Sequence, residues 1–143
     1  MREQVKEVYG LIDAYTSALD LRELDAWLAL FPEDGYYACV RWVEYEQGNN
    51  VVLIGEDMKR LRARVQAGKT QDRRRMAHMI SGVRVSTAGD EASAVFAMWY
   101  DGVATYTGRY RFELERKESK LLIRRCTVIL DNEVITAPIY MPI

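Results

Sequence analysis

Residues 103–116 show the most regular alternation of polar and apolar side chains in this sequence, which predicts an extended strand with two unlike faces. The apolar face consists of Tyr106, Tyr110, Phe112 and Leu114, and the polar face of Thr105, Thr107, Arg109, Arg111, Glu113 and Glu115. Successive side chains of a strand point to opposite sides of its sheet, so only one of these sets can line a core. The dipeptide Asp101-Gly102 just before it is a strong hairpin signal, which places an antiparallel strand beside it.

The first third of the sequence is dominated by helical periodicity. Apolar residues recur at spacings of three and four over residues 5–19, which predicts an amphipathic helix. Asp20 and Glu23 have the spacing of a capping box and predict the start of a second, shorter helix. Pro32 is expected to end that helix, because proline cannot continue the hydrogen-bonding pattern.

A third helix and five further strands are predicted in the rest of the sequence. The acidic pair Glu56-Asp57 suits the beginning of a helix that buries Met58, Leu61 and Val65, and Gly68 is its predicted C′ residue. The other strands are predicted over residues 36–43, 51–54, 76–86, 92–100 and 121–130, with a turn at residues 48–50.

Helices followed by a meander of strands predict an α+β fold. We expect one domain, residues 1–143, with N-terminal helices packed on one face of a curved mixed or antiparallel sheet that can enclose a cavity. No apolar run approaches the roughly 20 residues that cross a bilayer. The first residues lack the apolar core of a signal peptide, so we expect a cytoplasmic protein without membrane contact.

A single histidine, His78, restricts the metal chemistry that this sequence can support. A Rieske cluster needs two cysteines and two histidines, and a mononuclear iron site needs two histidines and a carboxylate. The sequence has only Cys39 and Cys126 beside His78, and both lie in apolar, strand-like stretches that predict buried, reduced thiols. The net charge of −1 provides no general field for nucleic acid. We therefore expect no metal, no cofactor and no nucleic acid in this chain.

Several short motifs, taken in their order along the sequence, resemble one protein family. They are Leu19-Asp20, residues 25–31 (DAWLALF), residues 33–37 (EDGYY), residues 78–85 (HMISGVRV), residues 107–110 (TGRY) and residues 124–132 (RRCTVILDN). Together they are similar to the small (β) subunit of bacterial aromatic-ring-hydroxylating dioxygenases. That family has a cone-shaped fold shared with scytalone dehydratase, ketosteroid isomerase and nuclear transport factor 2.

The resemblance implies a structural subunit with no catalytic residue and no cofactor of its own. The Rieske cluster and the mononuclear iron would lie in a partner, the large (α) oxygenase subunit, commonly three large with three small subunits. A homo-oligomeric arrangement of the small subunit, trimer or dimer, is also expected. The contacts would be made through the sheet face and the C-terminal tail.

A stand-alone dehydratase, isomerase or cyclase on the same fold is the alternative. His78 would then be the acid–base group, because imidazole titrates near neutral pH. Asp34 is the predicted orienting acid, and Tyr37 or Tyr15 the predicted hydrogen-bond donor to a small hydrophobic ligand. In scytalone dehydratase-like relatives, a histidine at a similar point in the strand does catalytic work.

Four other features have a structural and a functional interpretation. Asp13 and Asp20 lie two helical turns apart, but a solvated Asp13 and a helix-capping Asp20 are the simpler interpretation. Arg73-Arg74-Arg75 predicts an exposed loop or an interface with an acidic partner. Residues 138–143 form an apolar tail, which we expect to cover the domain or dock on a neighbour. The aromatic residues Trp27, Trp42, Trp99 and Tyr100 are expected to be mostly core, with one or two lining a cavity.

Overall fold

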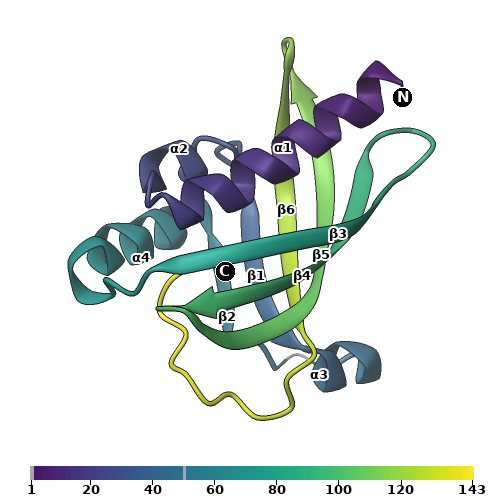
Figure 1. Ribbon diagram of the computed structural model, residues 1–143. Helices are drawn as coiled ribbons and strands as arrows, with labels where there is room; N and C mark the ends of the chain where they lie inside the picture. The colour runs from purple at the N-terminus through teal and green to yellow at the C-terminus, as the bar shows by residue number, and fades with distance from the viewer. Residues whose placement is uncertain (1, 50) are drawn as a thin grey trace.

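The computed structural model describes residues 2–49 and 51–143, in which four helices and six strands are present (Figure 1). In chain order they are α1 (Glu3–Asp20), α2 (Leu24–Leu28), β1 (Tyr36–Arg41), α3 (Trp42–Gln47), β2 (Ile54–Asp57), α4 (Met58–Gln71), β3 (Met76–Val85), β4 (Glu91–Tyr100), β5 (Val103–Lys117) and β6 (Lys120–Leu130). The predicted α+β class is confirmed. None of the helices in the described ranges is long and apolar enough to cross a membrane.

The six strands form one mixed sheet in the order β2-β1-β6-β5-β4-β3, which does not close on itself. β1 and β6 are parallel, and the other neighbouring strands are antiparallel. Figure 1 shows α1 lying across the curved sheet, with α2 and α4 beside it, while α3 lies at the opposite end. The residues after β6 form a tail, residues 131–143, that runs back under the sheet without helix or strand.

The core lies between α1 and the sheet, where the sequence patterns predicted it. All four apolar residues of the alternating strand β5 are buried, and so are Met58, Leu61 and Val65 of α4. The space predicted as a cavity is filled by aromatic side chains of α1, α2, β1 and β5 and by Ile143 of the tail, which is fully buried. A remaining pocket of about 10 Å³ is lined by Met141 and Pro142 of the tail among other residues.

The strand predicted over residues 36–43 is wrong at its end, because β1 stops at Arg41 and the short helix α3 follows. Aromatic and β-branched residues suggested a strand, but Arg41 pairs with Glu44 three residues later, a spacing that favours a helical turn. Gly48 ends α3 with a left-handed φ of 68°. The predicted turn at residues 48–50 includes Asn50, which lies outside the described residues.

Two predicted helix boundaries are also wrong. Asp20 is the last residue of α1 and its carboxylate bonds His78, while Glu23 precedes α2 without a side-chain cap. The predicted capping box does not form, because the Asp20 carboxylate bonds the distant residue His78 instead. Gly68 lies inside α4, where a Cβ would come within 1.8 Å of the Met141 sulfur. Glycine is required there because the tail approaches the helix closely.

These contacts predict opposite effects of the same substitution in two helices. Gly10→Ala in α1 should raise the free energy of unfolding by about 0.5–1 kcal/mol, because alanine is the better helix former and nothing lies within 4 Å of its Cβ. Gly68→Ala should instead lower it by about 1 kcal/mol, because the added methyl group displaces buried Met141. Urea unfolding of the two variants tests this. Equal stabilisation by both would contradict the close approach of the tail.

Candidate functional site

His78 of β3 and Asp20 of α1 form a partly buried pair. The Nδ1 of His78 lies 2.5 Å from Oδ1 of Asp20, and the His78 backbone N–H donates to Oδ2 at 3.0 Å. The His78 side chain is 0% exposed, and its Nε2 has no hydrogen-bond partner among the described residues. A carboxylate at Nδ1 favours the tautomer in which Nδ1 carries the proton and Nε2 is an acceptor. This arrangement suits an oriented base, and it equally suits a structural clamp.

The same pair protects an exposed edge of the sheet. β3 is the outermost strand on its side, so one row of its backbone groups has no strand to pair with. Asp20 accepts the His78 N–H from that row and joins the end of α1 to the strand. The carboxylate therefore connects the helical layer to the sheet edge, whatever chemistry the imidazole does.

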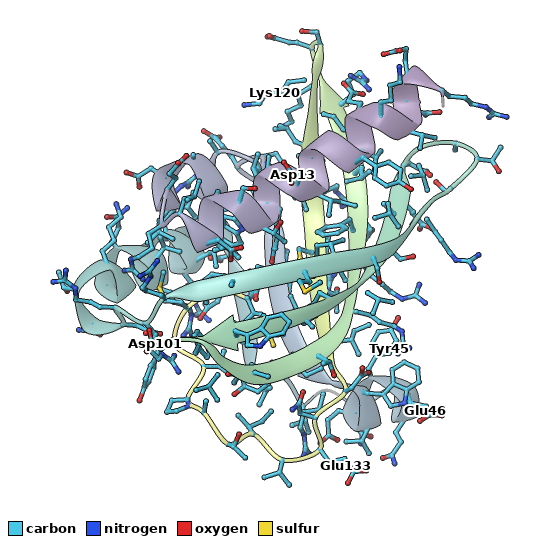
Figure 2. The ribbon with its side chains drawn as sticks, in the orientation of Figure 1. Asp13, Tyr45, Glu46, Asp101, Lys120 and Glu133 are labelled. Atoms are coloured by element: carbon cyan, nitrogen blue, oxygen red, sulfur yellow. The ribbon has the colours of Figure 1, made fainter. Side chains whose placement is uncertain are left out.

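The other residues predicted to assist His78 lie elsewhere. Asp34 is exposed after α2, with an oxygen 3.7 Å from the Lys117 ammonium, so Asp20 is the carboxylate on His78 instead. The hydroxyl of Tyr37 accepts from the backbone N–H of Ile143 at 2.9 Å, and Tyr15 donates to the Ile143 oxygen at 2.7 Å. Asp13, the partner considered for Asp20, is exposed on α1 (Figure 2).

The tyrosine and cysteine side chains inside the fold stay protonated at physiological pH. Burial raises the pKa of the Tyr15, Tyr37 and Tyr110 hydroxyls well above the usual value. It also raises the pKa of Cys39 to about 12 and that of Cys126 further. Both cysteines are free, buried thiols, as predicted. Within residues 2–49 and 51–143, no three His, Cys, Asp or Glu side chains gather closely enough to hold a metal ion.

The aromatic residues divide between core and surface. Trp27 and Tyr100 are buried, Trp99 is half-buried and Trp42 is 40% exposed. Trp42 and Tyr45 of α3 stand beside the polar face of the sheet (Figure 2 labels Tyr45). Trp42 is therefore a surface residue, which the strand prediction over residues 36–43 did not indicate.

A groove of about 410 Å³ runs between α3 and the polar face of the sheet. Arg125 and Arg111 line it, at 4.6 Å from the Tyr36 ring and 5.9 Å from the Tyr45 ring, and Arg109 stands outside it at 5.9 Å from the Trp42 ring. We call these six residues the arginine–aromatic face. Arginine stacked on aromatic rings offers both a planar donor fork and apolar area, the combination that is enriched at protein interfaces.

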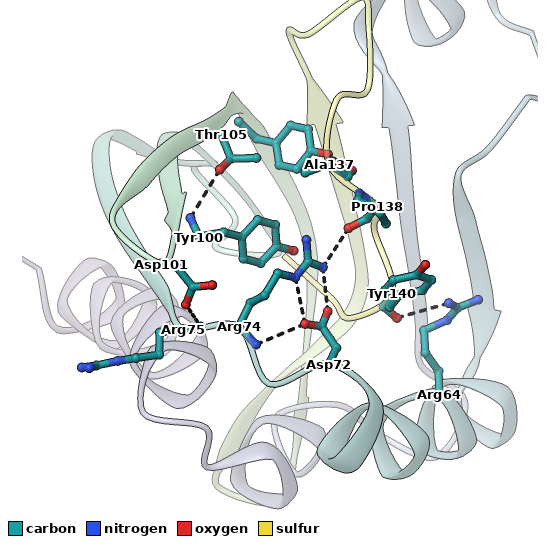
Figure 3. A network of polar contacts seen from close by, with 11 residues as sticks. Arg64, Asp72, Arg74, Arg75, Tyr100, Asp101, Thr105, Ala137, Pro138 and Tyr140 are labelled. Carbon is teal, nitrogen blue, oxygen red and sulfur yellow. Dashed lines mark hydrogen bonds and ion pairs between the residues drawn. The ribbon is translucent and has the colours of Figure 1, made fainter.

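The tail is tied to the body by side chains that bond its backbone oxygens (Figure 3). Arg74 donates to Pro138 at 2.8 Å, Arg64 donates to Tyr140 at 3.2 Å, and the Tyr106 hydroxyl donates to Ala137. Arg74 also pairs with buried Asp72 at 2.7 Å and lies 3.8 Å from the Tyr100 ring. The tail thus covers the domain, one of its two predicted roles.

The arginine run that contains Arg74 was predicted as an exposed loop or an interface. Arg73 and Arg75 are exposed, whereas Arg74 turns inward to Asp72. Nothing in the local sequence distinguishes the middle arginine from its neighbours, because its partners come from β4 and the tail as well as from Asp72. Its role in fixing the tail was missed for that reason.

The Asp72–Arg74 pair predicts a pH-dependent stability. Hydrogen bonds from Arg74 hold the pKa of Asp72 below its usual value, so its contribution is present at neutral pH and is lost as the pH falls through that lowered pKa. Asp72→Asn should therefore cost about 1–3 kcal/mol at pH 7 and progressively less below about pH 4. Urea unfolding of both proteins from pH 7 to pH 3 tests this; a constant difference across that range would contradict it.

Comparison with solved structures shows the same fold in other proteins. A protein assigned as the beta subunit of an aromatic-ring-hydroxylating dioxygenase from Novosphingobium aromaticivorans superimposes with a TM-score of 0.84 at 22% identity, covering 96% of this chain and 95% of its own. The beta subunit of benzoate 1,2-dioxygenase from Burkholderia mallei gives 0.73 at 21% identity, with coverages of 94% and 95%. A protein assigned as a scytalone dehydratase from Novosphingobium aromaticivorans gives 0.68 at 16%, with coverages of 98% and 93%.

These structures share the cone-like arrangement that the sequence motifs implied. No protein with a curated description matches the sequence significantly. Residues 15–137 match the family described as ring hydroxylating beta subunit, which is most of the chain and contains all of the sheet. The chain therefore belongs to the family of ring-hydroxylating dioxygenase beta subunits.

Proposed function

We propose that this small subunit supports an iron-bearing large subunit in the oxidation of aromatic compounds and carries no active site of its own. The family match over residues 15–137 is the observation that carries the proposal. The Rieske cluster and the mononuclear iron would both lie in the large subunit, since this sequence offers one histidine and two cysteines. The two protonated thiols suit a reducing compartment such as the cytoplasm.

The arginine–aromatic face is the surface we assign to the partner. It lies on the side of the sheet away from α1, and its charged side chains are exposed along β5 and β6. Arg109 is paired only loosely with Asp131 at 3.4 Å, and Arg125 with Glu113 at 3.7 Å. Such exposed pairs add little to stability, so their guanidinium groups can exchange these contacts for carboxylates of a partner.

The exposed part of the tail is a second surface that we assign to contacts between subunits. Val134 and Tyr140 are 70% and 57% exposed, although the residues after Tyr140 are buried in the domain. Exposed apolar side chains next to charged ones are typical of interfaces. We expect one of these surfaces to contact the large subunit and the other to contact further small subunits, in a trimer within a three-plus-three complex or in a dimer.

Co-expression tests the proposal. The chain should co-purify with a tagged large subunit from the same gene neighbourhood, at equal stoichiometry, and elute as one high-mass complex in size-exclusion chromatography. The large subunit expressed alone should aggregate or elute at a lower mass. Elution of the two chains as separate species under all conditions would contradict the proposed role.

An acid–base enzyme remains the second candidate, because the Asp20–His78 pair leaves a buried Nε2 acceptor. Such a base could activate a small ligand that enters the interior. If the chain has only a support role, the pair serves to hold α1 against β3. The two accounts differ in whether a variant of His78 changes the stability of the chain or an activity of the isolated chain.

For His78→Ala the support role predicts a loss of about 1–3 kcal/mol in stability, because Asp20 loses its partner. The yield of complex should fall, while turnover per iron in the complex that does form stays unchanged. Asp34→Ala, which removes only an exposed carboxylate, is the matched control and should change neither quantity. An isolated His78→Ala chain that keeps its fold but loses a dehydratase, isomerase or cyclase activity shown by the isolated wild-type chain would favour the acid–base role.

A further inference from the structure

A groove lies between α1 and the edge strand β3, which run alongside each other (Figure 1). It has a volume of about 260 Å³ and is lined by Tyr9, Ile12, Asp13 and Thr16 of α1 and by residues 80–83 of β3. On both elements the lining residues lie between two contacts that hold α1 in place. Asp20 bonds His78 on one side of them, and the Gln4 side-chain amide donates to the Ala88 oxygen at 3.0 Å on the other. The fold therefore fixes both ends of the groove and leaves the space between them open to a guest.

The β3 backbone beside this groove has hydrogen-bonding groups that β4 does not use. In an antiparallel pair, alternate residues direct both N–H and C=O to the neighbouring strand, and the residues between them direct both away. The Asp101 N–H donates to the Arg75 oxygen, whereas the His78 N–H donates to Asp20 rather than to β4. Ile80, two residues after His78, therefore directs its N–H and its oxygen away from β4. Within the described part of the chain, neither group bonds a residue outside the sheet.

These free groups suit a short extended peptide. An unpaired strand edge accepts a further strand through main-chain hydrogen bonds, and neighbouring pockets take alternate side chains. Asp20 already occupies the N–H of His78 on one side of Ile80. On the other side, a bulge between Ser81 and Arg84 interrupts the strand, and Gly82 has a left-handed φ of 61°. The accessible edge is therefore short and centred on Ile80.

The side chains along the groove select the sequence of such a peptide. Ile12 is buried, and Ile80 and Val83 are half-buried, so the groove offers apolar area to one side chain of the guest. Asp13 is exposed, and it takes part in none of the ion pairs formed by the described residues. Its carboxylate favours a lysine or arginine of the guest. The site therefore prefers an apolar residue close to a basic one.

We propose that a short extended segment of the large subunit, with an apolar residue close to a lysine or arginine, binds in this groove and adds a strand to the edge of β3. This inference rests on the proposed support role. The described part of a second small subunit offers no such segment, because its strands lie in the sheet and its tail is bound to the body. The groove selects a cation and the arginine–aromatic face selects carboxylates, so the two surfaces bind different parts of the partner.

The test compares Ile80→Pro with Ile80→Ala in binding to the immobilised large subunit by surface plasmon resonance. Proline lacks the N–H that an added strand would use, and β4 does not need that N–H. Alanine also shortens the side chain but keeps the N–H. Ile80→Pro should therefore bind about three- to tenfold more weakly than Ile80→Ala, the value of one hydrogen bond. Asp13→Lys should weaken binding about tenfold by repelling the basic residue, whereas Asp34→Lys, at an exposed site outside the groove, should change it less than twofold.

Photo-cross-linking of the assembled complex remains informative if Ile80→Pro does not fold. A chain with p-benzoylphenylalanine in place of Tyr9, which is 40% exposed, should cross-link to a segment of the large subunit that contains lysine or arginine. The same group in place of Arg62 on α4 should give no such product. Cross-links from position 9 only to another small subunit, or none in a complex that forms, would overturn the inference and leave the support role standing. Failure of the two chains to associate at all would overturn both.

Discussion

Trp27→Ala should lower the free energy of unfolding by about 3–5 kcal/mol, the usual cost of removing a large aromatic side chain from a core. Trp27 is fully buried, and its ring lies 4.9 Å from that of Phe31 and 5.8 Å from that of Tyr37. The contact with Tyr37 joins α2 to β1. The free energy of unfolding of a typical domain is about 5–15 kcal/mol, so this substitution would remove a large part of the stability. Urea unfolding followed by circular dichroism measures the loss.

Trp27→Phe separates the packing of the ring from its polar atom. The indole N–H has no partner in the described part of the chain, so phenylalanine loses some contact area but no hydrogen bond. A cost of about 1 kcal/mol is expected, well below that of alanine. Similar costs for the two variants would show that Trp27 is not the packing element we describe.

Arg111→Glu should weaken binding of the large subunit by a factor of about 30–1000, which corresponds to about 2–4 kcal/mol for an interface hot spot. Arg111 is exposed on β5 in the middle of the arginine–aromatic face and lies against Tyr45. A reversed charge there would repel the carboxylates that we expect on the partner. Surface plasmon resonance with the immobilised large subunit gives the dissociation constant.

Arg62→Glu provides the matched control, because Arg62 is equally exposed but lies on α4, away from that face. The affinity of the Arg62→Glu chain for the large subunit should stay within about twofold of the wild-type value. Both variants should keep the circular dichroism spectrum of the folded chain. If Arg62→Glu weakened binding of the large subunit strongly and Arg111→Glu did not, the interface would lie on the side of α4 and our assignment would be wrong.

The strands were predictable because their signal is local. The alternation in β5 and the dipeptide Asp101-Gly102 determine where the strand lies and which face is buried, and the structure confirms both. The end of β1 was not predictable in the same way. Trp42 and Val43 suit a strand by composition, while the contact of Arg41 with Glu44 that favours α3 depends on side-chain geometry.

The buried site was less predictable, because its contacts join residues far apart in the sequence. The capping-box spacing predicted that Asp20 caps the helix that follows it, but its partner His78 lies 58 residues away. Asp34 was chosen by its position after a helix, and it pairs with a surface lysine instead. The contacts of Tyr15 and Tyr37 with Ile143 span 128 and 106 residues, beyond the reach of any periodicity.

Iron analysis of the separated and assembled subunits tests the central claim most directly. The support role predicts that the purified chain holds no stoichiometric iron and converts no arene, and that all iron of the complex stays with the large subunit after dissociation. Tight, stoichiometric metal on the isolated chain, or turnover of an arene by it alone, would contradict the account.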